Sequence, residues 1–142
     1  MNWDDPDMIS DFLVEAEEHL DEIDSLLLEL DSDGSRGKLW TRITGTFHTI
    51  KGMASYVDFK EVQQVCHKIE SVLTAENATV GGNCRSNTDL AFDVVSCLRK
   101  RFGQLSDCLE SDAQLTDSPE VAAMLSRLSQ ITASQAPSKR RA

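Results

Sequence analysis

The chain of 142 residues lacks the features of a membrane protein, a secreted protein or a β-rich domain. It contains no apolar run of about 20 residues, the length that a membrane-spanning helix needs. Its first residues are acidic, whereas a secretory signal begins with basic residues and continues with apolar ones. Aromatic residues make up only 6% of the sequence, and strand-like alternation is scarce. These absences predict a helical protein without a membrane span, and we expect it in the cytoplasm.

The four cysteines, Cys66, Cys84, Cys97 and Cys108, form no CxxC pair. A chain of this length can bury one core without crosslinks, so we interpret them as reduced thiols. The sequence also lacks a GxxxxGKS or GxxxxGKT phosphate-binding loop and a glycine-rich nucleotide lid. We therefore expect that the chain does not bind ATP on its own.

The net charge of −10 makes nucleic acid an unfavourable partner, because its phosphates would be repelled. Much of the acid lies in the first helical segment. We interpret this acid as a solvated face, with a dedicated acidic docking surface as the alternative. The basic run from Arg99 to Arg101 is interpreted in the same way, as the solvated side of a later helix.

Apolar residues at helical spacing predict five helices. The first follows Asp5 and Pro6, a cap and a first-turn proline, and ends before the turn residues 31–34. The second covers about residues 37–56, and the third follows a capping box of Asp58 and Glu61. A loop over 77–87 precedes the fourth helix, and Ser118 and Pro119 begin the fifth. We predict an all-α domain over residues 1–131, an antiparallel up-down four-helix bundle with a fifth helix packed against it. Residues 132–142 have the composition of a flexible linker or a disordered tail.

The second predicted helix carries a histidine on its outer face. Leu39, Ile43, Phe47 and Ile50 share one face at about 100° per residue, and His48 lies about 140° from its centre. Gly45 and Gly52 flank the histidine, although a glycine inside a helix costs about 1 kcal/mol relative to alanine. An accessible imidazole beside Lys51 suits a nitrogen that receives and transfers a phosphoryl group. The alternative is an ordinary polar surface histidine.

The segment His48-Thr49-Ile50-Lys51-Gly52, followed by Ala54 and Phe59, resembles the phospho-accepting motif of histidine phosphotransfer (HPt) domains. It is most similar to the amino-terminal domain of the CheA chemotaxis kinases. The wider resemblance covers about residues 9–131, but only residues 43–73 carry specific motif positions. It implies that His48 is the phosphoacceptor of a carrier domain without an ATP site, within a larger histidine kinase.

The resemblance also implies partners and cofactors. An ATP-binding kinase domain, in cis or in trans, would phosphorylate His48, and a CheY-like response regulator would receive the phosphoryl group on an aspartate. ATP and Mg²⁺ would then belong to those partner domains, and we expect no cofactor or metal on this chain. We expect the domain itself to be a monomer.

Four further residues are candidates for the site. Glu70, at the edge of the third helix's apolar face, is expected to accept a hydrogen bond from Nδ1–H of His48. The resemblance supports this role, because HPt domains carry a His-x-x-Glu pair here, matched by His67 and Glu70. Lys51 would stabilise the phosphoryl charge. Thr49 could lend a hydroxyl to the site or bond its own backbone. His67 could tune the pocket or have no role, and we assign it no part in the transfer.

The sequence departs from the HPt pattern at two places. Asp58 stands where a glycine usually precedes Phe59, which predicts a side-chain cap in that turn. Thr44 and Gly45 replace an arginine-bearing turn, which puts in doubt which kinase or regulator surface is recognised.

Three alternatives remain open. The chain could be a free-standing HPt phosphorelay protein, or a helical adaptor without chemistry. A metal-binding bundle could use the donors His19, His48, His67, Glu22 and Glu70, although di-iron bundles need donors that point inward.

Overall fold

The computed structural model describes residues 1, 3–30, 36–77 and 85–135. This part of the chain forms five helices and no strand, which confirms the all-α prediction. The helices are α1 (Pro6–Glu29), α2 (Arg36–Tyr56), α3 (Lys60–Asn77), α4 (Arg85–Ser111) and α5 (Pro119–Gln135).

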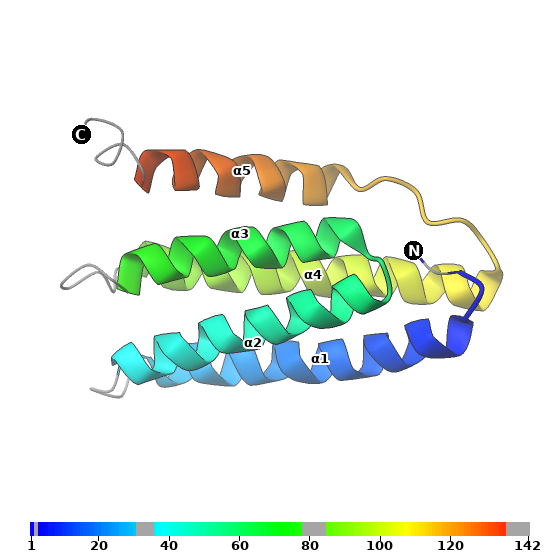
Figure 1. The fold of residues 1–142 in the computed structure, drawn as a ribbon, viewed down its shortest axis with the longest axis horizontal. Coiled ribbons are helices and arrows are strands. Elements are labelled where there is room, and N and C mark those ends of the chain that lie inside the picture. Colours follow the sequence, from blue (N-terminus) through cyan, green and yellow to red (C-terminus); the bar gives the residue numbers. More distant parts are fainter. Residues whose placement is uncertain (2, 31–35, 78–84, 136–142) are drawn as a thin grey trace.

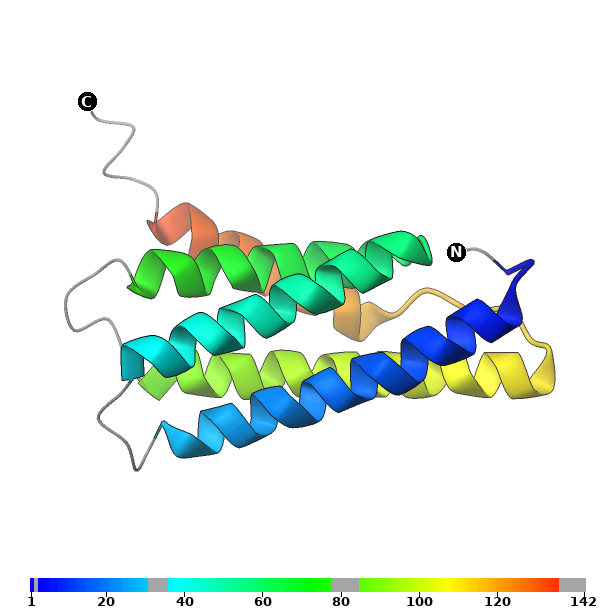
Figure 2. The same ribbon diagram turned by 60° about the horizontal axis from the view of Figure 1, so that its bottom comes forward.

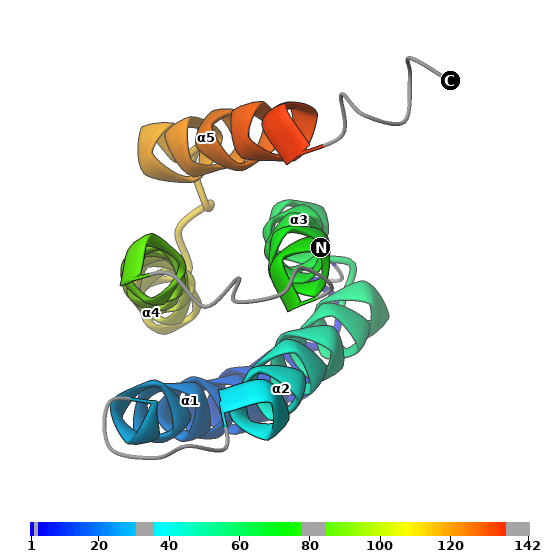
Figure 3. The ribbon, with the colours of Figure 1, turned by 90° about the vertical axis from the view of Figure 1, so that its left-hand side faces the viewer.

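Helices α1 to α4 alternate in direction and form the predicted up-down bundle (Figure 1). Helix α2 packs against both α1 and α3, and α1 also packs against α4. The end-on view of Figure 3 shows that α5 lies over α3 and α4, on the opposite side of the bundle from α1 and α2, and in Figure 2 it runs behind α3. The outer face of α2 is therefore left free of α5.

The helix starts follow the predicted capping residues. Asp5 caps α1, accepting a hydrogen bond from the backbone N–H of Met8 at 3.2 Å, and Pro6 is the first helical residue. The Ser118 hydroxyl accepts from the N–H of Val121 at 3.2 Å and caps α5 in the same way. Helix α5 continues through residues 132–135, which the composition had assigned to a linker. The predicted turn at 31–34 lies outside the described residues, as do 136–142 and most of the predicted loop at 77–87.

The turn between α2 and α3 differs from its prediction. Asp58 has a φ of 59°, a left-handed conformation. Its N–H donates to the Ser55 carbonyl at 3.1 Å, and the N–H of Phe59 donates to the Ala54 carbonyl at 2.8 Å. These bonds form a helix C-cap in which glycine usually holds the left-handed position. The predicted capping box is wrong, because the Asp58 carboxylate instead approaches the Met1 amine at 3.4 Å.

We expect Asp58→Gly to stabilise the protein by up to about 1 kcal/mol, because glycine adopts a positive φ without the Cβ penalty. Urea denaturation would measure the change. Asp112 follows the end of α4 in the same conformation, with a φ of 56°. Asp112→Gly should therefore also raise the free energy of unfolding by up to about 1 kcal/mol. A loss of stability in Asp58→Gly alone would show that the contact with the Met1 amine outweighs the backbone strain.

Aromatic side chains from three parts of the chain meet in the core. The ring of Phe12 in α1 packs edge-on against Phe102 of α4, with centroids 5.4 Å apart, and against Phe59 at 6.3 Å. The rings of Phe59 and Phe102 are 6.4 Å apart. Because edge-to-face contacts and apolar burial both favour this cluster, it ties the start of α3 to α1 and α4.

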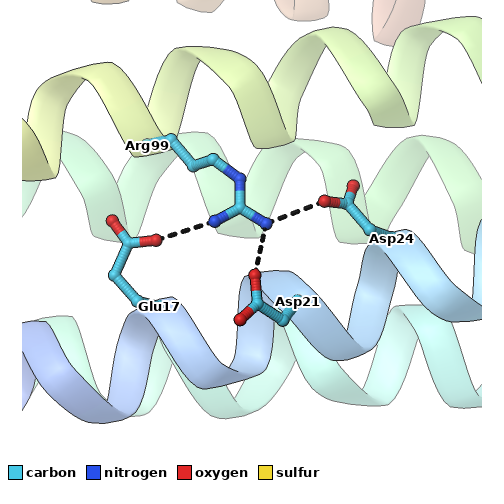
Figure 4. A network of polar contacts seen from close by, with 4 residues as sticks. All are labelled: Glu17, Asp21, Asp24 and Arg99. Atoms are coloured by element: carbon cyan, nitrogen blue, oxygen red, sulfur yellow. Dashed lines mark hydrogen bonds and ion pairs between the residues drawn. The ribbon is translucent and has the colours of Figure 1, made fainter.

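Two arginines of α4 hold the helices together. Arg99 reaches α1, where its guanidinium bonds Glu17 at 2.8 Å and both Asp21 and Asp24 at 2.7 Å (Figure 4). Arg101 is buried, with 5% of its side chain exposed, and pairs with Glu61 of α3. The prediction of a solvated flank is wrong for Arg101, because hydrogen-bond partners on α3 and before α5 compensate its burial. Part of the acid on α1 likewise serves as partner to Arg99.

Candidate functional site

Helix α2 presents His48 to solvent because the apolar residues around it point into the core. Ile43, Phe47 and Ile50 are completely buried in the core. The His48 side chain keeps 63% of its surface exposed. The predicted orientation of the ring is confirmed.

Glu70 of α3 lies beside this ring. One carboxylate oxygen, Oε2, is 3.0 Å from His48 Nδ1. The other, Oε1, accepts a hydrogen bond from the Lys51 ammonium at 3.1 Å. The side chains of Lys51 and Glu70 are each 23% exposed, so the carboxylate is more sheltered from water than the imidazole. The structure thus brings together three of the residues proposed from the sequence: His48, Lys51 and Glu70.

The contact with Glu70 determines which ring nitrogen is available for chemistry. A carboxylate can only accept a hydrogen bond, so Nδ1 carries the proton in this contact. In the neutral ring, Nε2 then has a free lone pair, and the exposed ring can present it to a reaction partner. Such a nitrogen is a nucleophile with a fixed orientation.

The direct pairing of Lys51 with Glu70 was not anticipated from the sequence. Lys51 follows His48 by almost one turn, so both side chains reach toward α3. The sequence predicts Lys51 only as a partner for the charge of a phosphoryl group. In the unmodified protein, its ammonium instead neutralises the carboxylate that orients the ring.

Thr49 and His67 lie on opposite sides of this group. The Thr49 hydroxyl donates to the Gly45 carbonyl at 3.1 Å, a bond within its own helix, and the residue lines a groove between α1 and α2. His67 is exposed on α3 and lines a hollow together with Lys51. Neither residue shares a hydrogen bond with His48 within the described part of the chain.

Cys66 lies beneath the site and is completely buried. Burial raises the pKa of its thiol, and the negative charge of Glu70 raises it further. The thiol is therefore protonated at neutral pH and unreactive. Cys97 and Cys108 are also free thiols, and Cys84 lies outside the described residues.

The histidines do not converge on a common centre in the described residues. His19 of α1 lies 3.8 Å from Glu22 of its own helix, while His48 faces Glu70. No group of three or more histidine, cysteine, aspartate or glutamate side chains is arranged to hold a metal ion in this part of the chain. No helix among the described residues is both long and apolar enough to cross a membrane.

Comparison with known proteins assigns the chain to a family. The Hpt domain family matches residues 7–133, which include all five helices almost completely. The chain therefore belongs to the Hpt domain family. No solved structure matches it significantly.

Curated relatives connect the chain with chemotaxis proteins. It is 38% identical over 66 residues to the chemotaxis protein CheA of Listeria monocytogenes, covering 46% of this chain and 11% of that protein. It is 33% identical over 67 residues to CheA of Halobacterium salinarum, covering 47% of this chain and 10% of the relative. The sensor histidine kinase CheAY of Helicobacter pylori is 34% identical over 67 residues, 47% of this chain and 8% of that protein. The chain thus spans about a tenth of the relatives that it matches.

Proposed function

We propose that His48 is phosphorylated by an ATP-binding histidine kinase domain and passes the phosphoryl group to an aspartate of a CheY-like response regulator. The observation that supports this proposal most is the state of the ring. Its Nδ1 is held by Glu70 at 3.0 Å, while most of the side chain is open to solvent. Membership of the Hpt domain family supports the same assignment.

The chemistry requires one nucleophilic nitrogen and a means of stabilising charge. Nε2 would attack the terminal phosphorus of ATP, forming an N–P bond while the P–O bond to ADP breaks and ADP keeps the electron pair. The ring then carries a positive charge, which the Glu70 carboxylate stabilises through Nδ1–H. The phosphoryl group brings nearly two negative charges, and the Lys51 ammonium is close enough to help neutralise them. In the second step, an aspartate oxygen attacks phosphorus and the N–P bond electrons return to Nε2.

The partners would supply what this chain does not carry. ATP would bind the kinase domain, and Mg²⁺ would bind both there and at the regulator's acidic acceptor site. Similarity to CheA and CheAY proteins favours a domain of a larger chemotaxis kinase over a free-standing carrier. In either case this domain is a phosphoryl carrier, and its histidine is the substrate of another enzyme.

Labelling with a kinase domain and radioactive ATP tests the proposal. A CheA kinase domain lacking its own phosphoacceptor should transfer phosphate to this chain. The label should be acid-labile and base-stable, as an N–P bond requires, and should move to a CheY receiver domain with Mg²⁺. An acid-stable label would contradict the assignment, and no label from the kinase or from a small phosphodonor would favour the adaptor alternative.

We expect Glu70→Gln to slow phosphoryl transfer by about 10- to 100-fold, the range typical when a metal-ligating histidine loses the carboxylate that orients it. The amide keeps the size of the side chain and can still accept a hydrogen bond, but it has no negative charge to stabilise the positive ring or to form an ion pair with Lys51. Rapid-quench measurements of labelling would give the rate, and circular dichroism would check the fold. An unchanged rate would show that Glu70 has no part in the reaction.

A further inference from the structure

Two hollows of different character flank His48. The larger, of about 730 Å³, lies between the start of α1 and the end of α2. Apolar side chains of Met8, Phe12, Met53 and Val57 contribute to it, and Thr49 and Gly52 connect it to the phosphorylation site. Its acidic residues are Asp5, Asp7, Asp11 and Glu15. No basic side chain lines this α1–α2 groove. An apolar surface bordered by carboxylates suits a partner surface with an apolar side chain among basic residues.

The second hollow, of about 470 Å³, lies on the α3 side of the site. It is lined by Lys51, Lys60, Gln63, Gln64 and His67, with no acidic side chain. Lys60 is exposed and forms no ion pair with a described residue. Lys51 is paired with Glu70, so Lys60 supplies the positive charge of this α3 hollow that no described residue neutralises. The hollow adjoins the proposed phosphoacceptor through Lys51.

Helix geometry explains why His48 lies on the border between the two. Successive side chains rotate by about 100°, so Lys51 lies about 60° to one side of His48. Gly52 and Thr49 lie about 40° and 100° to the other side. Lys51 accordingly lines the α3 hollow, whereas Gly52 and Thr49 line the α1–α2 groove.

Gly45 and Gly52 of α2 place no side chain on the groove side of His48. A Cβ atom added at Gly45 or Gly52 would meet nothing within 4 Å, so no neighbouring side chain of this chain requires a glycine there. Glycine nevertheless weakens a helix by about 1 kcal/mol relative to alanine. Packing within this chain therefore does not explain either glycine.

We propose that this charge asymmetry fixes the orientation in which the phosphoryl-accepting protein docks, an inference that rests on the proposed function. The acceptor aspartate, and the carboxylates that hold its Mg²⁺, form an anionic centre. This centre approaches over Lys51 and Lys60, where the hollow is lined by basic side chains and by no acidic one. A basic surface with a protruding apolar side chain occupies the α1–α2 groove. Complementary charges of this kind accelerate encounter and exclude the reversed orientation.

Two charge reversals of opposite sign test the orientation. Lys60→Glu removes positive charge from the α3 hollow, and Asp11→Lys removes negative charge from the groove. The wild-type chain and each variant would be phosphorylated with phosphoramidate and mixed with a CheY receiver domain and Mg²⁺. Both variants should lower kcat/KM for transfer by about 3- to 10-fold at low salt, through KM and with little change in the maximal rate. At high salt the kcat/KM values of the wild type and both variants should become similar, because salt screens the exposed charges.

The signs of the two effects separate this proposal from a simpler one. If only net charge mattered, Lys60→Glu and Asp11→Lys would change the rate in opposite directions, and that result would overturn the proposal. So would an effect of Asp11→Lys on phosphorylation by the kinase domain but none on transfer to the receiver, because the groove would then belong to the kinase. If the wild type accepts or transfers no phosphate, the proposed function itself fails.

Matched controls carry the same charge changes elsewhere. Lys38 is exposed near the start of α2, Asp89 is exposed near the start of α4, and neither lines the α1–α2 groove or the α3 hollow. Helices α2 and α4 begin at the same end of the bundle (Figure 1). Lys38→Glu and Asp89→Lys should change kcat/KM by less than about twofold at the same salt. Larger effects in the controls would mean that long-range charge, and not the two hollows, controls docking.

Discussion

His48→Gln is expected to abolish phosphorylation completely while leaving the fold intact. Glutamine keeps a polar side chain but has no nitrogen lone pair that can form an N–P bond. The substituted side chain is largely exposed, so the free energy of unfolding should change by less than about 0.5 kcal/mol. Labelling with radioactive ATP and a kinase domain would measure the first effect, and urea denaturation the second.

His19→Gln is the matched control for this experiment. His19 lies on α1 and contacts Glu22 of its own helix, so the variant loses a histidine without touching the candidate site. It should be labelled like the wild type. Label that persists in His48→Gln would assign phosphorylation to another residue and remove the basis of the proposed function.

Arg101→Met should be strongly destabilising, by about 3 kcal/mol. The guanidinium is almost fully buried and bonds Glu61, the Gln104 side chain at 2.7 Å and the Thr116 carbonyl at 2.8 Å. Removing it leaves a carboxylate and a carbonyl without partners in a sheltered place, which costs more than the pair itself contributes. Because these bonds join α3, α4 and the segment before α5, chemical denaturation should show a lower midpoint for the whole domain.

Lys100→Met provides the comparison. Lys100 is the preceding residue and pairs with Glu120 of α5, but 62% of its side chain is exposed. Surface ion pairs contribute about 0–1 kcal/mol, so this variant should be close to wild type. If both variants lost the same stability, burial would not be the reason for the effect of Arg101. The double variant Arg101→Met/Glu61→Gln should recover part of the loss, since no charge is then left unpaired.

Much of this fold could be predicted because its helices obey local rules. Pro6 and Ser118 mark helix starts through the cap and the fixed φ of proline. The 3.6-residue period placed Ile43, Phe47 and Ile50 inward, and His48 outward, without knowledge of the neighbouring helices.

The remaining features depend on contacts between helices, which periodicity does not encode. A basic run looks the same in sequence whether its members reach water or a neighbouring helix, so the burial of Arg101 beside Glu61 could not be seen. The sharing of Glu70 by His48 and Lys51 depends on the rotation and register of α3 against α2. Asp58 could either cap the start of α3 with its side chain or end α2 in a left-handed conformation. The structure has the second, because the backbone hydrogen bonds at the end of α2 place Asp58 in its C-cap.

The division of the site between two helices limits how it can be copied. A peptide with the sequence of α2 would contain the imidazole and the ammonium but lack the carboxylate, which comes from α3. An isolated α2 would also lack the tertiary packing that supplies most of the stability of helices in proteins. Transplanting this chemistry onto another scaffold therefore requires the α2–α3 hairpin, residues 36–77, together with a surface that covers its apolar side.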